Sequence, residues 1–316
     1  MAALNTILNL VTCGLGAVLG TGTKGCKQFM RKTTTLWFVP DGFEFDGTQT
    51  LDETYAKLLQ AQGNLIVLKD AKTFTDNSSD DIIETLEDGT KQLATEGLYE
   101  FALTFINGLA FHAALTSLNS FGSYNVLFVD RDGNMLGTKA DSGNLKGFSV
   151  GMLQAMKLSF PTDSVGQKEG LAFQLTRRRE LDTDYVYISN DQLNGFKPQN
   201  LDGINEVVLS YPTTPSDGDT NLVIDARLKQ NQKPFTGADD LANYLIQVAG
   251  STVTPSGVVE SAIPTFTGGR YTFAGLTLST GDAVSAAIND TANNRAVIDL
   301  GGDLYKSNTA SIDVVA

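Results

Sequence analysis

The chain has 316 residues but only two cysteines and one histidine, so the side chains most used in catalysis and metal binding are scarce. Cys13 and Cys26 cannot form a disulfide framework, and their flanks lack the doubled spacing of a zinc site. With His112 as the single histidine, general acid–base work would fall to carboxylates. We therefore expect no metal, no cofactor and no catalytic residue.

Basic residues are also few, with 23 Lys and Arg against 36 Asp and Glu and a net charge of −13. Residues 1–195 and 196–316 carry balances of −7 and −6, so no basic domain is hidden in the average. Proteins that grip nucleic acid use clustered Lys and Arg. The run at residues 177–179 is followed by acidic residues, which favours a salt-bridged, exposed strand edge.

No apolar run is long enough to cross a bilayer. The N-terminal run within residues 1–28 is interrupted by Asn5 and Asn9, and no basic residue precedes it as in a signal peptide. We interpret it as an apolar arm that docks onto a neighbouring copy or onto its own domain, with a secretion signal as the alternative. The residues predicted for self-association are Leu4, Ile7, Leu8, Leu10 and Val11.

One motif suggests a hydrolase. Residues 147–151 match the G-x-S-x-G pattern, but that chemistry needs a histidine after the serine, and His112 precedes it. A nucleophile elbow also needs a buried strand before it and a helix after it, and the sequence predicts neither around residues 147–151. We predict a glycine-rich strand turn here.

Three further motifs suggest ligands and fail on spacing. Residues 20–25 lack the Gly-Lys-Ser/Thr order of a phosphate loop. Residues 130–134 place glycine wrongly for a calcium loop, and their Asp, Asn and Gly are what a hairpin turn requires. Residues 141–143 match the aspartic protease signature only once, which favours a turn.

Strand patterns dominate the first part of the chain. Residues 99–105 alternate large apolar and smaller or polar side chains, and residues 126–139 read as a hairpin around a Gly-containing turn. Other expected strands lie at residues 34–38, 64–68, 147–160, 170–176 and 185–187.

Helical signals are fewer. We expect helices at residues 51–59 and 109–118, and a helical turn or two within residues 77–86.

The second part of the chain predicts a separate β domain. Residues 196–204 read as a linker, and short strands separated by glycine turns follow over residues 205–316. This spacing suggests an immunoglobulin-like sandwich. Its expected strands are residues 207–209, 222–224, 244–248, 271–273, 276–278, 284–288, 297–298 and 312–314.

The order of elements in residues 33–189 resembles that of phage tail tube (major tail) proteins. An acidic loop at residues 76–88 precedes the alternating strand 99–105, the short helix 109–118, the hairpin 126–139 and the two long strands that follow. An added immunoglobulin-like domain is also common in that family. The N-terminal arm and residues 36–60 depart from the family pattern.

This resemblance implies a mainly-β protein: a tail-tube-like sandwich or barrel with a short helix over residues 29–195, followed by an immunoglobulin-like sandwich. It also implies a virion protein, assembled in the host cytoplasm, whose copies form rings stacked into a tube. Other tail proteins would be partners, and DNA would pass without specific binding or membrane contact. As an acidic lumen or inter-ring loop the sequence offers Asp76, Asp80, Asp81 and Glu84.

Two alternatives stay open at this point. The chain could be another virion component, such as a capsid, head-decoration or adhesin subunit with the same immunoglobulin-like module. It could also be a carboxylate-based hydrolase, which would need a deep cleft with two facing carboxylates.

Overall fold

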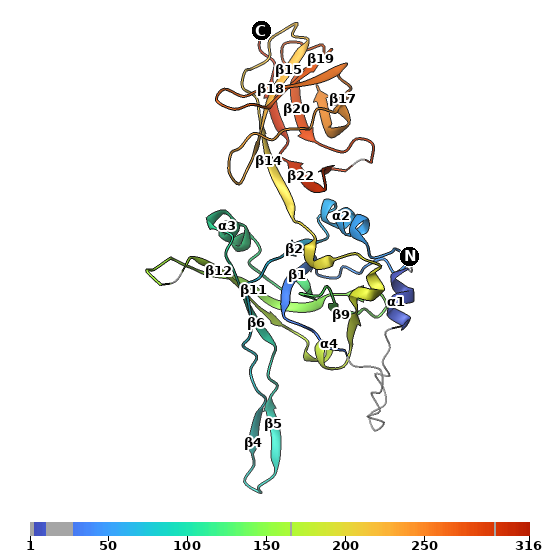
Figure 1. The fold of residues 1–316 in the computed structure, drawn as a ribbon, viewed down its shortest axis with the longest axis vertical. Coiled ribbons are helices and arrows are strands. Elements are labelled where there is room, and N and C mark those ends of the chain that lie inside the picture. Colours follow the sequence, from blue (N-terminus) through green and yellow to red (C-terminus); the bar gives the residue numbers. More distant parts are fainter. Residues whose placement is uncertain (1–2, 11–27, 165, 294) are drawn as a thin grey trace. The chain divides into compact units, whose positions relative to one another are not determined.

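The computed structural model describes residues 3–10, 28–164, 166–293 and 295–316 (Figure 1). The fold is mainly β, as the sequence predicts. The chain divides into two compact units, of which unit 1 comprises residues 1–59 and 63–201 and unit 2 comprises residues 60–62 and 202–316.

Unit 1 contains most of the helices and the longest strands. Its strands are β1 (Thr33–Pro40), β2 (Ile66–Leu68), β3 (Thr73–Asp76), β4 (Ile82–Thr85), β5 (Lys91–Thr95), β6 (Glu100–Phe105), β7 (Ser120–Phe121), β8 (Tyr124–Asp130), β9 (Met135–Lys139), β10 (Leu145–Lys146), β11 (Phe148–Ser159), β12 (Lys168–Leu175) and β13 (Tyr185–Ile188). The helices are α1 (Leu4–Leu10), α2 (Glu53–Ala61), α3 (Leu109–Ser117) and α4 (Arg178–Asp182). The 3-10 turns are η1 (Asn190–Leu193) and η2 (Pro198–Asn200).

Most of these strands form one sheet that bends at β11. Its order is β10-β9-β8-β11-β12-β6-β3, with β1 beside β8, β2 beside β1, β13 beside β9 and β7 beside β11. The start of β11 pairs with β8, and the rest of β11 pairs with β12. One long strand therefore joins two halves of the sheet, which face each other across a core.

Strand β1 is buried on both faces. Leu36 and Phe38 point into the core between the two halves of the sheet, where they meet Phe173 and other side chains of β12 and β6. Trp37 and Val39 alternate with them and lie in a second core, which α1 and α2 help to form. The period of two along a strand explains this division of side chains between two cores.

The structure corrects two expectations for unit 1. Residues 82–85 form strand β4 rather than a helical turn, because Ile82 and Ile83 are β-branched and pair with β5. The expected linker begins later than predicted, since Pro198 and Leu201 are buried and Leu201 belongs to the second core of unit 1.

Unit 2 is a sandwich of two sheets. Its strands are β14 (Ile204–Ser210), β15 (Asn221–Leu228), β16 (Tyr244–Val248), β17 (Ser251–Val253), β18 (Gly257–Ala262), β19 (Gly269–Ala274), β20 (Ala283–Ile288), β21 (Ile298–Leu300), β22 (Asp303–Ser307) and β23 (Ala310–Asp313), with the 3-10 turn η3 (Leu241–Asn243). One sheet has the order β18-β19-β15-β14-β22-β21 and the other β17-β16-β20-β23. Apolar side chains of both sheets, such as Ile224, Tyr271 and Val284, form its core.

Strands β17, β18 and β22 are absent from the sequence-based expectation. Residues 276–278, expected as a strand, lie outside the strands, although Leu276 and Leu278 are buried. The apolar residues of this segment correctly predict burial, but a buried segment need not be a strand.

Candidate self-assembly surfaces

The most conspicuous surface of unit 1 is a hairpin made by β4 and β5. Strands β3 and β6 pair with each other, and the chain between them leaves the sheet at the Glu100 end of β6 (Figure 1). It returns through a tight turn in which Gly89 has a φ of 82°. Asp88 accepts the amide of Thr90 at 2.9 Å in the same turn. We call residues 77–99 the hairpin.

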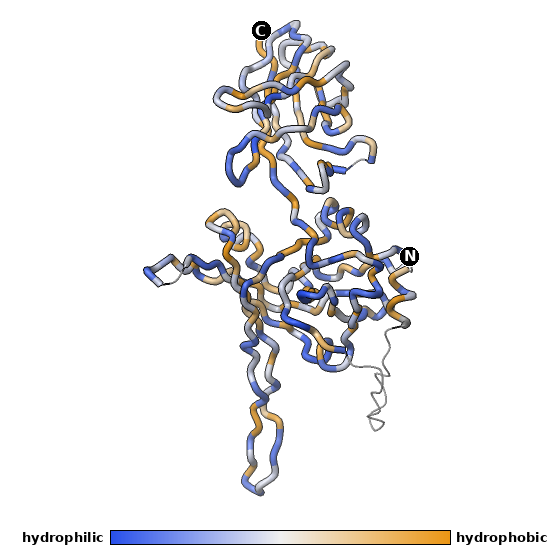
Figure 2. Tube along the Cα trace, in the orientation of Figure 1, coloured by the Kyte–Doolittle hydropathy of each residue, from blue (hydrophilic) through white to orange (hydrophobic). Residues whose placement is uncertain are grey.

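The hairpin exposes large apolar side chains. Ile83 pairs with Leu93 across the two strands, and these side chains are 61% and 52% exposed. Ile82 and Leu86 are exposed as well, and every residue of β4 and β5 is exposed. Figure 2 shows hydrophobic residues along this projection. A two-stranded ribbon is at best marginally stable in water by itself, so these side chains lack the cover that a stable hairpin needs.

The root of the hairpin is held firmly in contrast to its tip. Asp81 accepts the amide of Gly97 at 2.9 Å and also pairs with Arg178 of α4. A Cβ on Gly97 would collide with the carbonyl oxygen of Ser79, so only glycine permits this close approach. The two strands therefore leave the domain in a fixed direction.

The electrostatics of this root favour the charged form of Asp81. The hydrogen bond from the Gly97 amide contributes most to holding the pKa of Asp81 below its ordinary value. Desolvation opposes this effect, and the Arg178 guanidinium lowers the pKa further. Arg178 in turn binds Asp182 at 2.8 Å. The carboxylates of this cluster are thus bound to donors.

A second unpartnered surface lies at the other end of β6. Phe105 of β6 pairs with Glu169, and α3 begins shortly after it, beyond Gly108. Only Leu115 of α3 is fully buried, and Leu109 is 62% exposed. Figure 2 shows α3 as largely hydrophobic. A helix that is apolar on both faces is normally covered on both.

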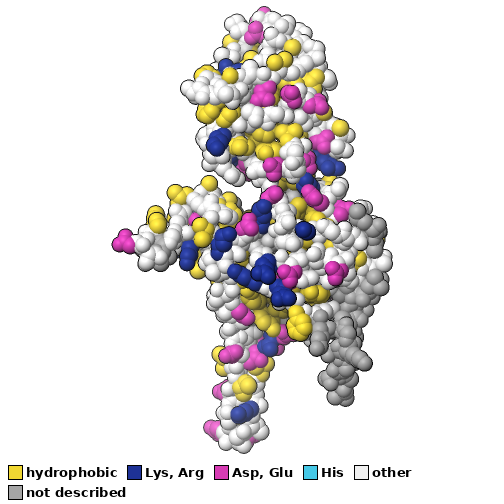
Figure 3. All heavy atoms as spheres, in the orientation of Figure 1, with side chains coloured by type: hydrophobic (Ala, Val, Ile, Leu, Met, Phe, Trp, Pro, Cys, Tyr) yellow, Lys and Arg dark blue, Asp and Glu magenta, His cyan; other side chains and the backbone are white. Residues whose placement is uncertain are grey.

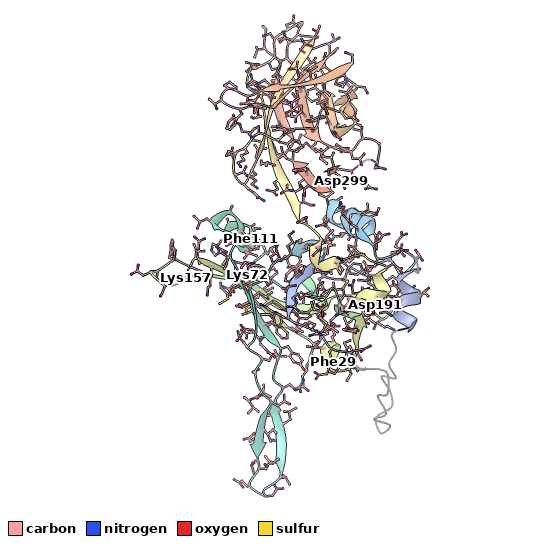
Figure 4. The ribbon with its side chains drawn as sticks, in the orientation of Figure 1. Phe29, Lys72, Phe111, Lys157, Asp191 and Asp299 are labelled. Carbon is pink, nitrogen blue, oxygen red and sulfur yellow. The ribbon has the colours of Figure 1, made fainter. Side chains whose placement is uncertain are left out.

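The turn between β11 and β12 adds to this surface. Ser159 pairs with Lys168 at the base of the turn, and the next residue, Phe160, is 71% exposed. Figure 4 places Lys157 on this projection, beside α3, which carries the labelled Phe111. Both elements therefore present apolar side chains at the same end of unit 1.

The sheet of unit 1 also has an open edge. Strand β3 is the last strand in the order β12-β6-β3 and pairs with β6 alone. The backbone groups on its outer side have no strand partner among the described residues. Open edges of this kind are templates for pairing with another chain.

The four residues predicted for an acidic lumen or inter-ring loop all lie at or on the hairpin. Asp76 ends β3, Asp80 and Asp81 lie in the ascending segment, and Glu84 pairs with Gln92 in the ribbon. The sequence analysis interprets this acidic stretch as a loop and misses the two strands of the hairpin. The signal for a hairpin was available, because Asp88-Gly89 lies between two stretches with strand propensity.

Of the two alternatives for the N-terminal arm, the described residues show docking onto its own domain rather than exposure for self-association. Leu4, Ile7 and Leu8 are buried in the second core of unit 1, and the amide of Leu4 donates to the carbonyl of Gln49 at 2.8 Å. We therefore assign these three residues to the core of their own domain rather than to a contact between copies. Leu10 ends α1, and Val11 lies outside the described residues.

The serine of the G-x-S-x-G motif has a structural role. Ser149 lies within strand β11, and its amide and hydroxyl donate to the buried Glu180 at 2.7 and 2.9 Å. The ammonium group of Lys146 forms an ion pair with the same Glu180 carboxylate, with an Nζ–Oε1 distance of 3.1 Å. A nucleophile elbow requires a sharp strand-to-helix turn, which this position is not.

The two other acidic motifs of this region are turns, as predicted. Asp130 ends β8 and accepts hydrogen bonds from the amides of Asp132 and Asn134 in the turn that leads to β9, both at 2.9 Å. In residues 141–143, Gly143 has a φ of 88° and closes the turn between β9 and β10. Asp130 thus stabilises its turn by accepting backbone amides, and Gly143 supplies the left-handed backbone conformation that its turn requires.

The basic run at residues 177–179 is salt-bridged, as predicted, but it opens a short helix rather than a strand edge. Arg177 pairs with Glu180 at 3.7 Å and Arg179 pairs with Asp184 at 3.0 Å. The run lines an open hollow of about 520 Å³ at the root of the hairpin, together with Asp81 and Asp182. Both of those carboxylates bind Arg178, so they do not form a free acid–base pair.

Across residues 3–10, 28–164, 166–293 and 295–316, no cluster of three or more His, Cys, Asp or Glu side chains could hold a metal ion. Within the same described ranges, no helix has the length and apolar character needed to cross a bilayer.

Comparisons with known proteins give little. No protein-family model matches the chain, and no curated protein matches it. Among solved structures, a weak resemblance is to SGBP-B of the Bacteroides ovatus mixed-linkage glucan utilization locus, in complex with a mixed-linkage heptasaccharide. The identity is 11%, the TM-score is 0.19, and the match covers 79% of this chain and 62% of that one. A TM-score this low carries no argument about fold or function.

Proposed function

We propose that this chain is a structural virion protein whose copies assemble into stacked rings and form the tail tube of a phage. The observation that carries the proposal is the hairpin, which projects from unit 1 with Ile83 and Leu93 exposed as a cross-strand pair. A monomer gains nothing from an apolar ribbon in water, whereas a second copy can cover it.

The open edge at β3 supports the same proposal. Closing a ring by pairing sheet edges between neighbouring copies removes such edges, which otherwise invite uncontrolled aggregation. The low charged fraction of 19% and the 31 glycines also suit a protein that covers much of its surface with partners.

The charge of the chain supports passage of DNA without binding. A cationic wall would hold phosphates with salt-dependent affinity, while a net charge of −13 repels them. The three arginines at residues 177–179 are each engaged in an ion pair with a carboxylate. In this proposal other tail proteins are the remaining partners, assembly takes place in the host cytoplasm, and no cofactor, catalysis or membrane contact is involved.

Negative-stain electron microscopy of the concentrated, purified protein tests the proposal. We expect hollow, regular tubes or stacked rings with an open bore. Immunogold labelling of virions should mark the tail. Label on the head or on the cell surface would select the alternative virion roles, and a protein that stays monomeric under all conditions would contradict ring assembly.

A further inference from the structure

The hairpin needs a partner surface, and unit 1 has one that matches it in chemistry. We propose that the hairpin of one copy docks onto a patch on the next copy formed by Ile106, Leu109, Phe160, Lys157 and Lys168. We call these five residues the α3 patch. This inference rests on the proposed function and adds to it the surface that receives the hairpin.

The chain segments that carry the α3 patch are joined by backbone and side-chain contacts. Glu169 is buried and accepts the amide of Asn107 at 2.9 Å, which ties the loop before α3 to the start of β12. Ile106 precedes this anchor, and Lys168 precedes Glu169 and pairs with Ser159. Phe160 follows Ser159 directly. The exposed side chains thus come from three neighbouring segments at one end of the sheet.

The hairpin and the α3 patch both expose large apolar side chains. Ile106 is 57% exposed, and like Leu109 and Phe160 it presents an apolar side chain at this end of the sheet, where α3 carries no Asp, Glu, Lys or Arg. The hairpin offers Ile83 and Leu93 in return. Burying such side chains against each other is the main favourable contribution to obligate contacts between copies.

The charges are complementary as well. The ribbon of the hairpin carries Glu84, Glu87 and Asp88 against Lys91 alone. The α3 patch carries two exposed lysines, with Asp163 as the acidic residue of the turn between them. Figure 3 shows acidic side chains along the hairpin and basic side chains near the other end of unit 1. Opposite charges at the rim favour encounter and fix orientation.

The position of the two surfaces requires two different copies. The hairpin leaves the sheet at the Glu100 end of β6, and the α3 patch lies at the Phe105 end. One chain therefore cannot place its own hairpin on its own patch. A contact between different surfaces is heterologous and repeats from copy to copy, unlike a two-fold contact, which stops at two.

The test mixes two variants that each lack one half of the contact. Ile83→Asp disables the hairpin and Leu109→Asp disables the patch, with Phe160→Asp as a second patch variant and Val259→Asp as a matched control. Val259 is an apolar residue of unit 2 that is 66% exposed, and we expect the same substitution there to leave assembly unchanged. All substituted side chains are exposed, and circular dichroism checks that each variant is folded.

We expect each disabling variant alone to require a protein concentration at least roughly tenfold higher for assembly, as is typical of anchor residues in interfaces. At a protein concentration at which neither variant assembles alone, sedimentation velocity should show that an equimolar mixture of Ile83→Asp and Leu109→Asp forms a species of twice the mass of either variant. One intact hairpin and one intact patch remain in that mixture, which allows a single contact.

The outcomes separate this inference from the proposed function. If the wild-type protein forms tubes and the two patch variants do so equally well, the α3 patch is excluded while the tube remains. If the mixture shows no species heavier than either variant alone, the heterologous pairing is wrong. A wild-type protein that never assembles overturns both proposals.

Discussion

At the scale of single residues, buried polar groups fix unit 2 in one arrangement. Tyr271 is fully buried, and its hydroxyl donates to the carbonyl of Phe235 at 2.9 Å. Burial raises the pKa of the Tyr271 hydroxyl, so it stays protonated and remains a donor. In unit 1, the buried carboxylate of Glu180 accepts hydrogen bonds from Lys146 and Ser149 and so links α4 to β10 and β11.

Substituting Tyr271→Phe should lower the free energy of unfolding of unit 2 by about 1–3 kcal/mol, because a buried carbonyl loses its donor. Chemical denaturation followed by fluorescence or circular dichroism measures the change. Tyr305→Phe is the matched control, because the Tyr305 hydroxyl makes a long hydrogen bond of 3.4 Å to Asp303 near the surface. Its removal should change the free energy of unfolding by less than about 0.5 kcal/mol. Equal costs for the two variants would contradict the assigned role.

At the scale of elements, α1 is a short helix that serves as part of a core. Leu8 is buried among side chains of unit 1, while the neighbouring Thr6 is exposed. We expect Leu8→Ala to lower the free energy of unfolding of unit 1 by about 2–5 kcal/mol, the usual range for a buried leucine. Thr6→Ala should change it by less than about 0.5 kcal/mol. If Leu8→Ala instead leaves stability intact and impairs assembly, α1 acts between copies.

The hairpin root should respond to acid through Asp81. Its pKa is lowered in the folded chain, so its bond to Gly97 is fully present above the ordinary value of about 3.9. The bond is lost only as the pH falls through the lower folded value. The protection factor of the Gly97 amide in hydrogen exchange should therefore be constant from pH 5 to 8, in the range where carboxylates are ionised, and decrease in strong acid.

Asp81→Asn is the control for this pH dependence. Asparagine keeps an acceptor oxygen but does not titrate, so the acid-dependent loss of protection should disappear. A wild-type protein whose Gly97 protection is unchanged in strong acid would show that Asp81 does not hold the root.

At the scale of the whole molecule, the chain has separate cores in its two units. The cores of unit 1 gather around β1 and β11, and that of unit 2 lies between its two sheets. A domain with its own core can fold alone. We expect calorimetry to resolve two unfolding transitions, of which Tyr271→Phe shifts only one. A single transition that shifts as a whole in that variant would contradict independent folding.

The sequence by itself determined the features that depend on neighbouring residues. The alternation in residues 99–105 and the turn residues at 130–134 each specify a local geometry, and β6 and the β8–β9 hairpin form where they predict. Helices α2 and α3 also lie where expected. The mainly-β class follows from such local patterns.

Only the tertiary structure decided what each apolar or charged segment meets. An apolar helix such as α1 has the same sequence pattern whether it enters its own core or a neighbour's. The turn signal at Asp88-Gly89 predicts a hairpin but does not show whether that hairpin packs on its own domain or projects from it. Hydrophobic burial is non-directional and depends on partners far away in the chain. For this reason the exposed Ile83–Leu93 pair and the α3 patch emerge from the fold alone.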